Sequence, residues 1–199
     1  MRPSLKSKFI QMHSFCSSSP PQHDQRGFTM IELMVVVGIL AVLAALAAPN
    51  FTPMIERYRV RQSVEELTST FYFARSEAIK RGGGIAIAKT ANVPGVCSFA
   101  TTPTDWGCGW VVFIDTNNDG IVNGTEQILQ TAPPPANSKV VMPANTGSIR
   151  VNRWGNFTGI PAAGIFVFPG AKTSSDPSSF LVCVAASGKI KTIPASGTC

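Results

Sequence analysis

Gly27-Phe28-Thr29-Met30-Ile31-Glu32 heads an uncharged, apolar run that continues through residues 33–48. Glu32 is the only charged side chain in this stretch. On insertion scales, an ionised carboxylate near the centre of a bilayer costs roughly 2.5–3.5 kcal/mol. Such a side chain needs a partner or a task, so the segment around Glu32 is a candidate functional site.

The stretch that begins at Gly27, G-F-T-M-I-E-L-M-V-V-V-G-I-L-A-V-L-A-A-L-A-A-P, resembles the class III signal of type IV pilins and type II secretion pseudopilins. The resemblance implies that a prepilin peptidase cleaves between Gly27 and Phe28, and that the new amine of Phe28 is N-methylated. It also implies assembly with other pilins into a helical filament. There, Glu32 would pair with the methylated Phe28 amine of a neighbouring subunit, which offsets much of the desolvation cost.

Residues 1–27 mix Ser, Pro, Gln and basic residues without periodicity, which is typical of a disordered leader. Lys6, Lys8 and Arg26 lie on the amino side of the apolar run, so the positive-inside rule places its carboxyl side outside the cytoplasm. We therefore expect a single-pass protein of a bacterial inner membrane. Its C-terminal domain would be periplasmic, and the protein would enter a filament after assembly.

A conventional secretory signal peptide is the alternative interpretation of the same segment. Ala45-Leu46-Ala47 would be its cleavage site, and a soluble protein would begin near Ala48. Glu32 would then open the hydrophobic region, and the region before it would be unusually long. The mass of the mature N-terminus distinguishes the two interpretations.

Charge and histidine content restrict the function further. The formal net charge is +6, but residues 1–27 hold four basic residues against one acidic residue, which leaves 13 basic and 10 acidic residues in the rest. A mature protein would thus be only mildly basic, without a broad nucleic-acid footprint. Both histidines, His13 and His23, lie in the leader. Their absence from the mature chain argues against histidine-dependent catalysis, so we expect no enzyme.

Five cysteines are present, and Cys16 falls in the leader. The remaining Cys97, Cys108, Cys183 and Cys199 form an even set in an exported chain, which predicts a disulfide framework with three possible connectivities. Pairing near neighbours, Cys97–Cys108 and Cys183–Cys199, is the simplest choice. A four-cysteine metal site is the alternative, although no C-x-x-C spacing occurs.

After Pro49 and Pro53, which can bend or interrupt a helix, apolar residues recur at three- and four-residue steps. The spacing predicts an amphipathic helix that ends at Gly82-Gly83-Gly84 and packs a sheet against its apolar stripe. From Phe28 to Arg81 a continuous helix would be roughly 80 Å long. The stripe consists of Ile55, Tyr58, Val64, Leu67, Phe71, Ala74 and Ala78.

Beyond the glycines, short segments rich in Val, Ile and Phe alternate with Gly, Pro, Asn and Ser clusters, which predicts seven or eight antiparallel strands. The expected strands are 85–89, 109–115, 126–131, 139–142, 148–152, 164–168, 180–185 and 189–193. The predicted architecture is α+β and pilin-like, with a long N-terminal helix, transmembrane in its first half, packed on an antiparallel β domain. Its parts are a cleaved leader (1–27), a transmembrane or filament-core segment (28–53), an amphipathic half-helix (54–84) and the β domain (85–199).

Two segments of the C-terminal part resemble one family in particular, the GspH/FimT family. They are A-R-S-E-A-I-K-R from Ala74 and W-G-C-G-W-V-V-F-I-D-T-N from Trp106. The resemblance implies a minor pseudopilin of type II secretion or a minor pilin of type IV pili. Such a subunit is structural and helps to prime the filament at or near its tip.

A further pattern, D-x-N-x-D-G-x₅-E, is formed by Asp115, Asn117, Asp119, Gly120 and Glu126. Oxygen ligands at alternating positions with a distal Glu are typical of a calcium loop. However, strands rather than helices are expected on both sides, and Asn, Asp and Gly also suit a tight strand connection. Calcium and a plain turn both remain open, and no other cofactor is expected.

Ser187-Gly188-Lys189-Ile190-Lys191 resembles the G-R-x-R motif with which some FimT-type minor pilins bind DNA for natural transformation. Alternation along a strand places Lys189 and Lys191 on one face, where both can contact phosphates. Lys replaces both Arg residues, so the bidentate guanidinium is lost. The alternative is a solvated strand face. Arg150, Arg153 and Lys172 are candidates to extend a basic patch.

Overall fold

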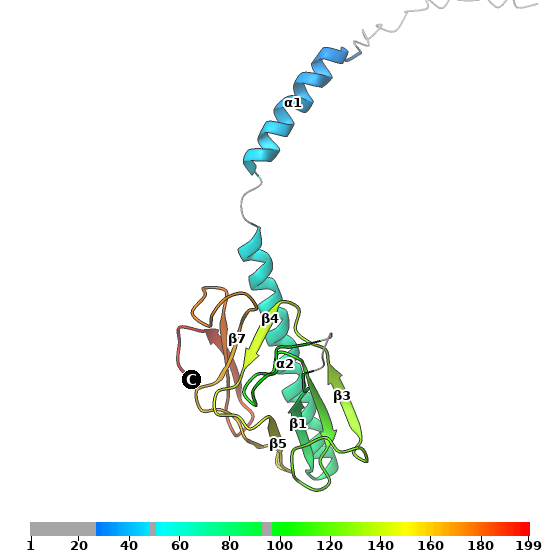
Figure 1. The fold of residues 1–199 in the computed structure, drawn as a ribbon, viewed down its shortest axis with the longest axis vertical. Coiled ribbons are helices and arrows are strands. Elements are labelled where there is room, and N and C mark those ends of the chain that lie inside the picture. Colours follow the sequence, from blue (N-terminus) through cyan, green and yellow to red (C-terminus); the bar gives the residue numbers. More distant parts are fainter. Residues whose placement is uncertain (1–26, 48–50, 93–96) are drawn as a thin grey trace, which may run out of the picture. The chain divides into compact units, whose positions relative to one another are not determined.

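The computed structural model describes residues 27–47, 51–92 and 97–199 (Figure 1). Contacts within the chain divide it into two compact units, Met1–Pro49 and Asn50–Cys199. In the first unit the structure describes helix α1, Met30–Ala47. The second unit holds helix α2, Thr52–Arg81, and all nine strands of the described residues.

The structure describes two helices where we expected one continuous helix from Phe28 to Arg81. α1 ends at Ala47, and α2 begins at Thr52 with Pro53 in its first turn. Proline has no N–H to donate, and its fixed φ suits the start of a helix better than its interior. Pro49 lies outside the described residues.

The C-terminal end of α2 lies where the sequence predicted it. Gly82 adopts the left-handed conformation, with φ of 79°, and the N–H of Gly83 donates to the carbonyl of Ala78 at 2.7 Å. Glycine accepts this conformation without a Cβ penalty. Lys80 and Arg81 lie in the last turn, where cations favour the helix dipole.

The strands follow the predicted ranges to within two residues at each end, and one short strand was not predicted. They are β1 Ile85–Lys89, β2 Trp110–Ile114, β3 Ile128–Ala132, β4 Ser138–Val141, β5 Ser148–Val151, β6 Phe157–Thr158, β7 Ile165–Pro169, β8 Phe180–Val184 and β9 Ile190–Pro194. The additional strand is β6, whose two residues are too few for an alternating pattern.

The strands form two antiparallel sheets rather than one. The first has the order β3-β2-β1-β5-β6, and the second has the order β4-β7-β8-β9. In the first sheet Ile87 pairs with Val112 on one side and with Ile149 on the other. α2 contacts β1 and β5 of the first sheet and β4, β7 and β8 of the second, so one helix serves both sheets (Figure 1).

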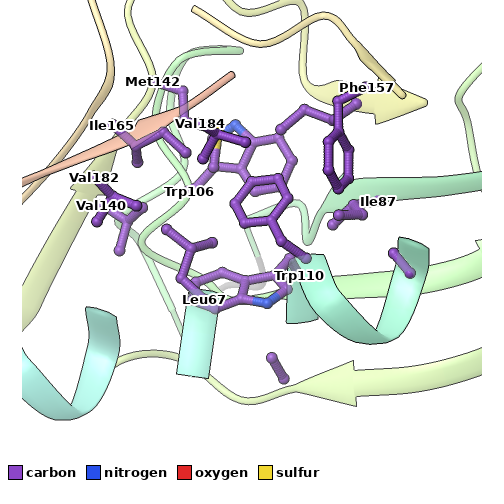
Figure 2. Close-up of a cluster of buried hydrophobic side chains, with 14 of the residues drawn as sticks. Leu67, Ile87, Trp106, Trp110, Val140, Met142, Phe157, Ile165, Val182 and Val184 are labelled. Carbon is purple, nitrogen blue, oxygen red and sulfur yellow. The ribbon is translucent and has the colours of Figure 1, made fainter. Parts of the chain in front are cut away.

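The core lies between α2 and the two sheets. Leu67, Trp106, Trp110 and Phe157 are buried there together with aliphatic side chains from both sheets (Figure 2). The indole Nε1 of Trp110 donates to the hydroxyl of Thr70 at 2.9 Å, which ties β2 to α2. This domain therefore confirms the predicted α+β class, with a helix packed on antiparallel strands.

Only part of the predicted apolar stripe of α2 faces this core. Val64, Leu67, Phe71, Ala74 and Ala78 are buried as expected. The prediction was wrong for the first turns, because Ile55 and Tyr58 are exposed (47% and 65%). Val60 is the first buried residue of α2, and at 3.6 residues per turn it lies on the face opposite Ile55 and Tyr58.

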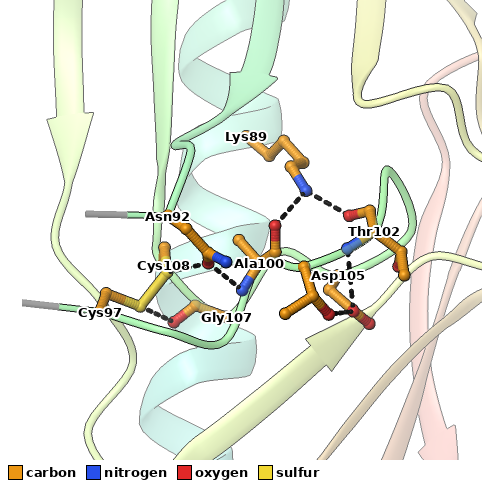
Figure 3. The surroundings of a disulfide bond; sticks show 9 residues. Lys89, Asn92, Cys97, Ala100, Thr102, Asp105, Gly107 and Cys108 are labelled. Carbon is orange, nitrogen blue, oxygen red and sulfur yellow. Dashed lines mark hydrogen bonds between the residues drawn. A yellow bond between two sulfur atoms is a disulfide. The ribbon is translucent and has the colours of Figure 1, made fainter. Parts of the chain in front are cut away.

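Two disulfides join the near-neighbour cysteine pairs proposed above. Cys97 bonds to Cys108 with an S–S distance of 2.00 Å, and Cys183 bonds to Cys199. Around the first bond, the side-chain oxygen of Asn92 accepts from the N–H of Ala100 at 2.7 Å (Figure 3). The Lys89 amine donates to the carbonyls of Ala100 and Thr102. Burial lowers the pKa of Lys89.

Candidate functional site

The predicted processing site lies directly before α1. Gly27 and Phe28 precede the helix, and the Phe28 side chain is 83% exposed. The hydroxyl of Thr29 accepts from the backbone N–H of Glu32 at 3.3 Å, so Thr29 is the N-cap. The helix thus begins three residues after the predicted cleavage site. Sequence reasoning missed this cap, although Thr followed three residues later by Glu is the pattern of a capping box.

Glu32 lies in the first turn of α1, where a negative charge is stabilised by the helix dipole. Its side chain is exposed, and no described cation forms a salt bridge with it. The pairing with a neighbouring Phe28 amine therefore stays a prediction about another chain.

Apart from Glu32, α1 is apolar around its circumference, and the side chains of residues 27–44 are exposed. A helix of this kind is usually buried in other protein or in lipid. Among the described residues, no helix is both long enough and apolar enough to cross a membrane. The transmembrane assignment of residues 28–53 is therefore not confirmed.

The Asp115–Glu126 loop uses its carboxylates for internal hydrogen bonds. Buried Asp115 accepts from the N–H groups of Asp119 and Gly120, both at 3.1 Å, and Arg150 Nε lies 3.7 Å from it. Glu126 accepts from the N–H groups of Thr116 and Asn123, both at 3.0 Å. These bonds fix the connection between β2 and β3.

The other two predicted ligands are engaged in the same way. The Asn117 side chain accepts from the N–H of Asp119 and donates to the Asp119 carboxylate at 2.8 Å. Hydrogen bonding from the Ile121 N–H lowers the pKa of Asp119. Within the described ranges, no three His, Cys, Asp or Glu side chains are grouped as metal ligands. The calcium interpretation stays a prediction, and in this structure the carboxylates of the loop accept from its own N–H groups.

The predicted DNA-binding lysines flank the start of the edge strand β9. The β8–β9 turn is closed by the Gly188 N–H donating to Ala185 O at 2.8 Å, and by the Ala185 N–H donating to Lys189 O at 2.9 Å. Lys189 and Lys191 are exposed and, two residues apart, lie on one face. Neither forms a salt bridge within the described part of the chain.

Arg75 of α2 also reaches this turn, which sequence reasoning missed. A Cβ built on Gly188 or on Gly155 would collide with the Arg75 side chain, and both glycines have positive φ. Beside Gly155, the exposed Arg153 and Trp154 stand on a turn held by the Asn152 side chain, which accepts from the Trp154 N–H at 2.9 Å. Only the fold brings α2 and these two turns together.

Two cations proposed to extend the basic patch are paired instead. Arg150 lies beside Asp115, and Lys172 donates to Glu56 at 2.6 Å and lies 3.1 Å from Asp176. These carboxylates raise the pKa of Lys172. Of the three candidates, only Arg153 is exposed without a salt bridge in the described residues.

Residues 63–188, more than half of the chain, match the family described as type II transport protein GspH. The chain belongs to the GspH family. Residues 22–48 also match the prokaryotic N-terminal methylation motif, which implies a membrane-anchored, prepilin-like protein. This GspH-family chain is thus a structural subunit of the type IV pilin and pseudopilin class, as the sequence indicated.

Curated relatives resemble mainly one part of the chain. A fimbrial protein of Pseudomonas aeruginosa is 41% identical over 66 residues, covering 33% of this chain and 42% of the relative. The pilin-like protein PilA1 of Thermus thermophilus is 31% identical over 93 residues, covering 47% and 50%. The chain therefore spans half or less of the length of these relatives.

A solved structure agrees over most of the fold. The type IV minor pilin FimU of Pseudomonas aeruginosa PAO1 matches with a TM-score of 0.51 and 18% identity. The match covers 72% of this chain and 94% of FimU. At this identity the likeness concerns the fold, and it agrees with the helix-on-sheets architecture of residues 50–199.

Proposed function

We propose that this protein is a minor pilin or pseudopilin that is processed at Gly27–Phe28 and built into a filament through α1. A methylation motif and a GspH domain in one chain carry the proposal. The precursor is held in the bacterial inner membrane by a single pass, and residues 50–199 lie in the periplasm. Two disulfides in that unit fit an oxidising compartment.

Glu32 is the assembly residue in this proposal. Its carboxylate stands on an apolar helix without a described cation partner, so the methylated amine of Phe28 in a neighbouring subunit would neutralise it. We expect Glu32→Gln to lower incorporation into sheared filaments at unchanged cellular protein level. Glu65→Gln, an exposed carboxylate of α2, is the matched control and should be incorporated normally. Equal incorporation of Glu32→Gln and wild type would contradict the assembly role.

Processing has its own test. Mass spectrometry of the mature protein should give an N-terminus at Phe28 that carries one added methyl group. An N-terminus near Ala48 would instead support a secretory signal peptide.

A gene deletion identifies the filament that the subunit serves, if pili and secreted proteins are measured separately. Loss of a pilus subunit should reduce pili, whereas loss of a pseudopilin should reduce protein secretion.

The exposed Lys189 and Lys191 favour a second candidate function, DNA binding at a pilus tip. The two side chains are two strand positions apart, and Arg75 lies behind Gly188. We expect residues 50–199 to shift DNA at low salt, and Lys189→Ala/Lys191→Ala to lower the slope of log affinity against log salt by about two. Lys80→Ala/Lys139→Ala removes the same charge elsewhere and should leave the slope unchanged. Absence of any shift would rule out this function.

A further inference from the structure

The N-cap residue and the first two turns of α2 carry an apolar stripe that faces away from the core. It consists of Phe51, Met54, Ile55 and Tyr58, of which Met54 is 70% and Tyr58 65% exposed. The spacing of three and four residues places all four on one face of the helix. Val60 and Val64 are buried on the opposite face. The start of α2 therefore has a second apolar face, which is exposed to solvent and is not the face that packs on the sheets.

Arginines flank this apolar stripe on both sides. At 3.6 residues per turn, Arg57 and Arg61 follow one edge of the stripe and Arg59 follows the other. The Cζ atoms of Arg57 and Arg61 lie 5.9 and 5.7 Å from the centroid of the Phe180 ring. The aromatic ring holds both guanidinium groups beside the stripe.

The charge around the stripe is uncompensated. None of the three arginines forms a salt bridge among the residues that the structure describes. The one carboxylate in these two turns, Glu56, is taken by Lys172 at 2.6 Å. Glu65 and Glu66 follow only after the stripe has ended. An anionic surface fits this end of α2, and the acidic residues beyond it limit the contact to the first turns.

We propose that the apolar stripe and its flanking arginines dock on anionic phospholipid headgroups at the periplasmic surface of the inner membrane. The inference rests on the proposed membrane anchoring of the precursor. Residues 48–51, between Ala47 and Thr52, can span at most about 18 Å. Along the chain, the start of α2 therefore follows the proposed anchor directly.

The composition of the surface favours lipid over a second copy of this chain. Helices that lie in a membrane interface combine an apolar face with basic flanks and aromatic residues, as here with Phe51 and Tyr58. A second copy would bring its own three arginines against these three. Docking would hold the precursor with its β domain close to the membrane until assembly removes it.

The test uses the full-length chain in vesicles of phosphatidylcholine alone or with phosphatidylglycerol. Flotation with the vesicles is measured first. Amide hydrogen exchange of residues 52–62 is then compared between the two compositions. We expect slower exchange with phosphatidylglycerol, and the difference should shrink in high salt. Arg57→Gln/Arg61→Gln should weaken docking by about fivefold per arginine, whereas Lys80→Gln/Arg81→Gln, at the other end of α2, should not.

The possible outcomes are distinguishable. A chain that does not float with either vesicle would overturn the proposed anchoring. A chain that floats, but whose exchange over 52–62 is the same in both lipids, would overturn the docking surface alone. Protection that depends on protein concentration rather than on lipid charge would assign the stripe to a second copy and likewise overturn the lipid proposal.

Discussion

Asp115 shows how one side chain can organise a connection. Its buried carboxylate accepts two backbone N–H groups at 3.1 Å, and Arg150 is the nearest cation. Asp115→Ala would leave the donors of Asp119 and Gly120 without this acceptor. We expect a loss of about 2–3 kcal/mol in the free energy of unfolding, measured by urea denaturation. Asn123→Ala, in the same loop but bonding through an exposed amide, should cost less.

Replacing the partly buried Glu66 with Gln should increase the stability of the protein in a pH-dependent way. Burial raises the pKa of its carboxyl in the folded state. The folded state thus binds this proton more tightly than the unfolded state, and stability falls as pH rises above the ordinary value of 4.5. Glu66→Gln should therefore stabilise the protein at pH 7 and have little effect near pH 4, as measured by unfolding at both values. A gain of the same size at both pH values would contradict the role of burial.

At the scale of elements, α2 and β2 are joined by a polar contact inside the core. The Thr70 hydroxyl accepts from Trp110 Nε1 and donates to Glu66 O, both at 2.9 Å. Thr70→Val preserves the shape but leaves the buried indole N–H unpaired, which costs about 1–3 kcal/mol. Thermal unfolding should place Thr70→Ser, which keeps the hydroxyl, closer to wild type. Equal stability of the Val and Ser variants would mean that the bond contributes nothing.

At the scale of the whole molecule, the Cys183–Cys199 bond ties the C-terminus to β8. It closes a loop of 16 residues, for which the chain-entropy model gives about 3 kcal/mol. Gly164 lies close to both the Cys199 sulfur and the side chain of Leu181, a β8 residue that is 1% exposed. Cys183→Ser/Cys199→Ser should lower the free energy of unfolding by that amount while the β8–β9 pairing remains, as followed by hydrogen exchange. A loss of the whole fold would assign the bond a larger role.

The sequence by itself determined the features that depend on local order along the chain. The Gly27–Glu32 motif identified the class of pilins and pseudopilins, because the motif consists of residues that are adjacent in the sequence. The end of α2 was predictable because Gly82 adopts a conformation that glycine alone accepts readily. The alternation of apolar and polar residues located eight strands, because every second side chain of a strand points to the same face of the sheet. Cysteine spacing favoured the two near-neighbour pairs among three connectivities, since short loops close at low entropic cost, and the structure contains these pairs.

Only the tertiary structure decided the features that depend on distant partners. Val60 and Val64 face the sheets, whereas Ile55 and Tyr58 lie on the opposite face of α2 and are exposed. The sequence does not show partners for Arg150 and Lys172, but the fold places Asp115 beside Arg150 and Glu56 beside Lys172. The structure also shows which backbone N–H groups donate to the carboxylates of Asp115 and Glu126. Contacts between distant segments are set by packing, which no local pattern contains.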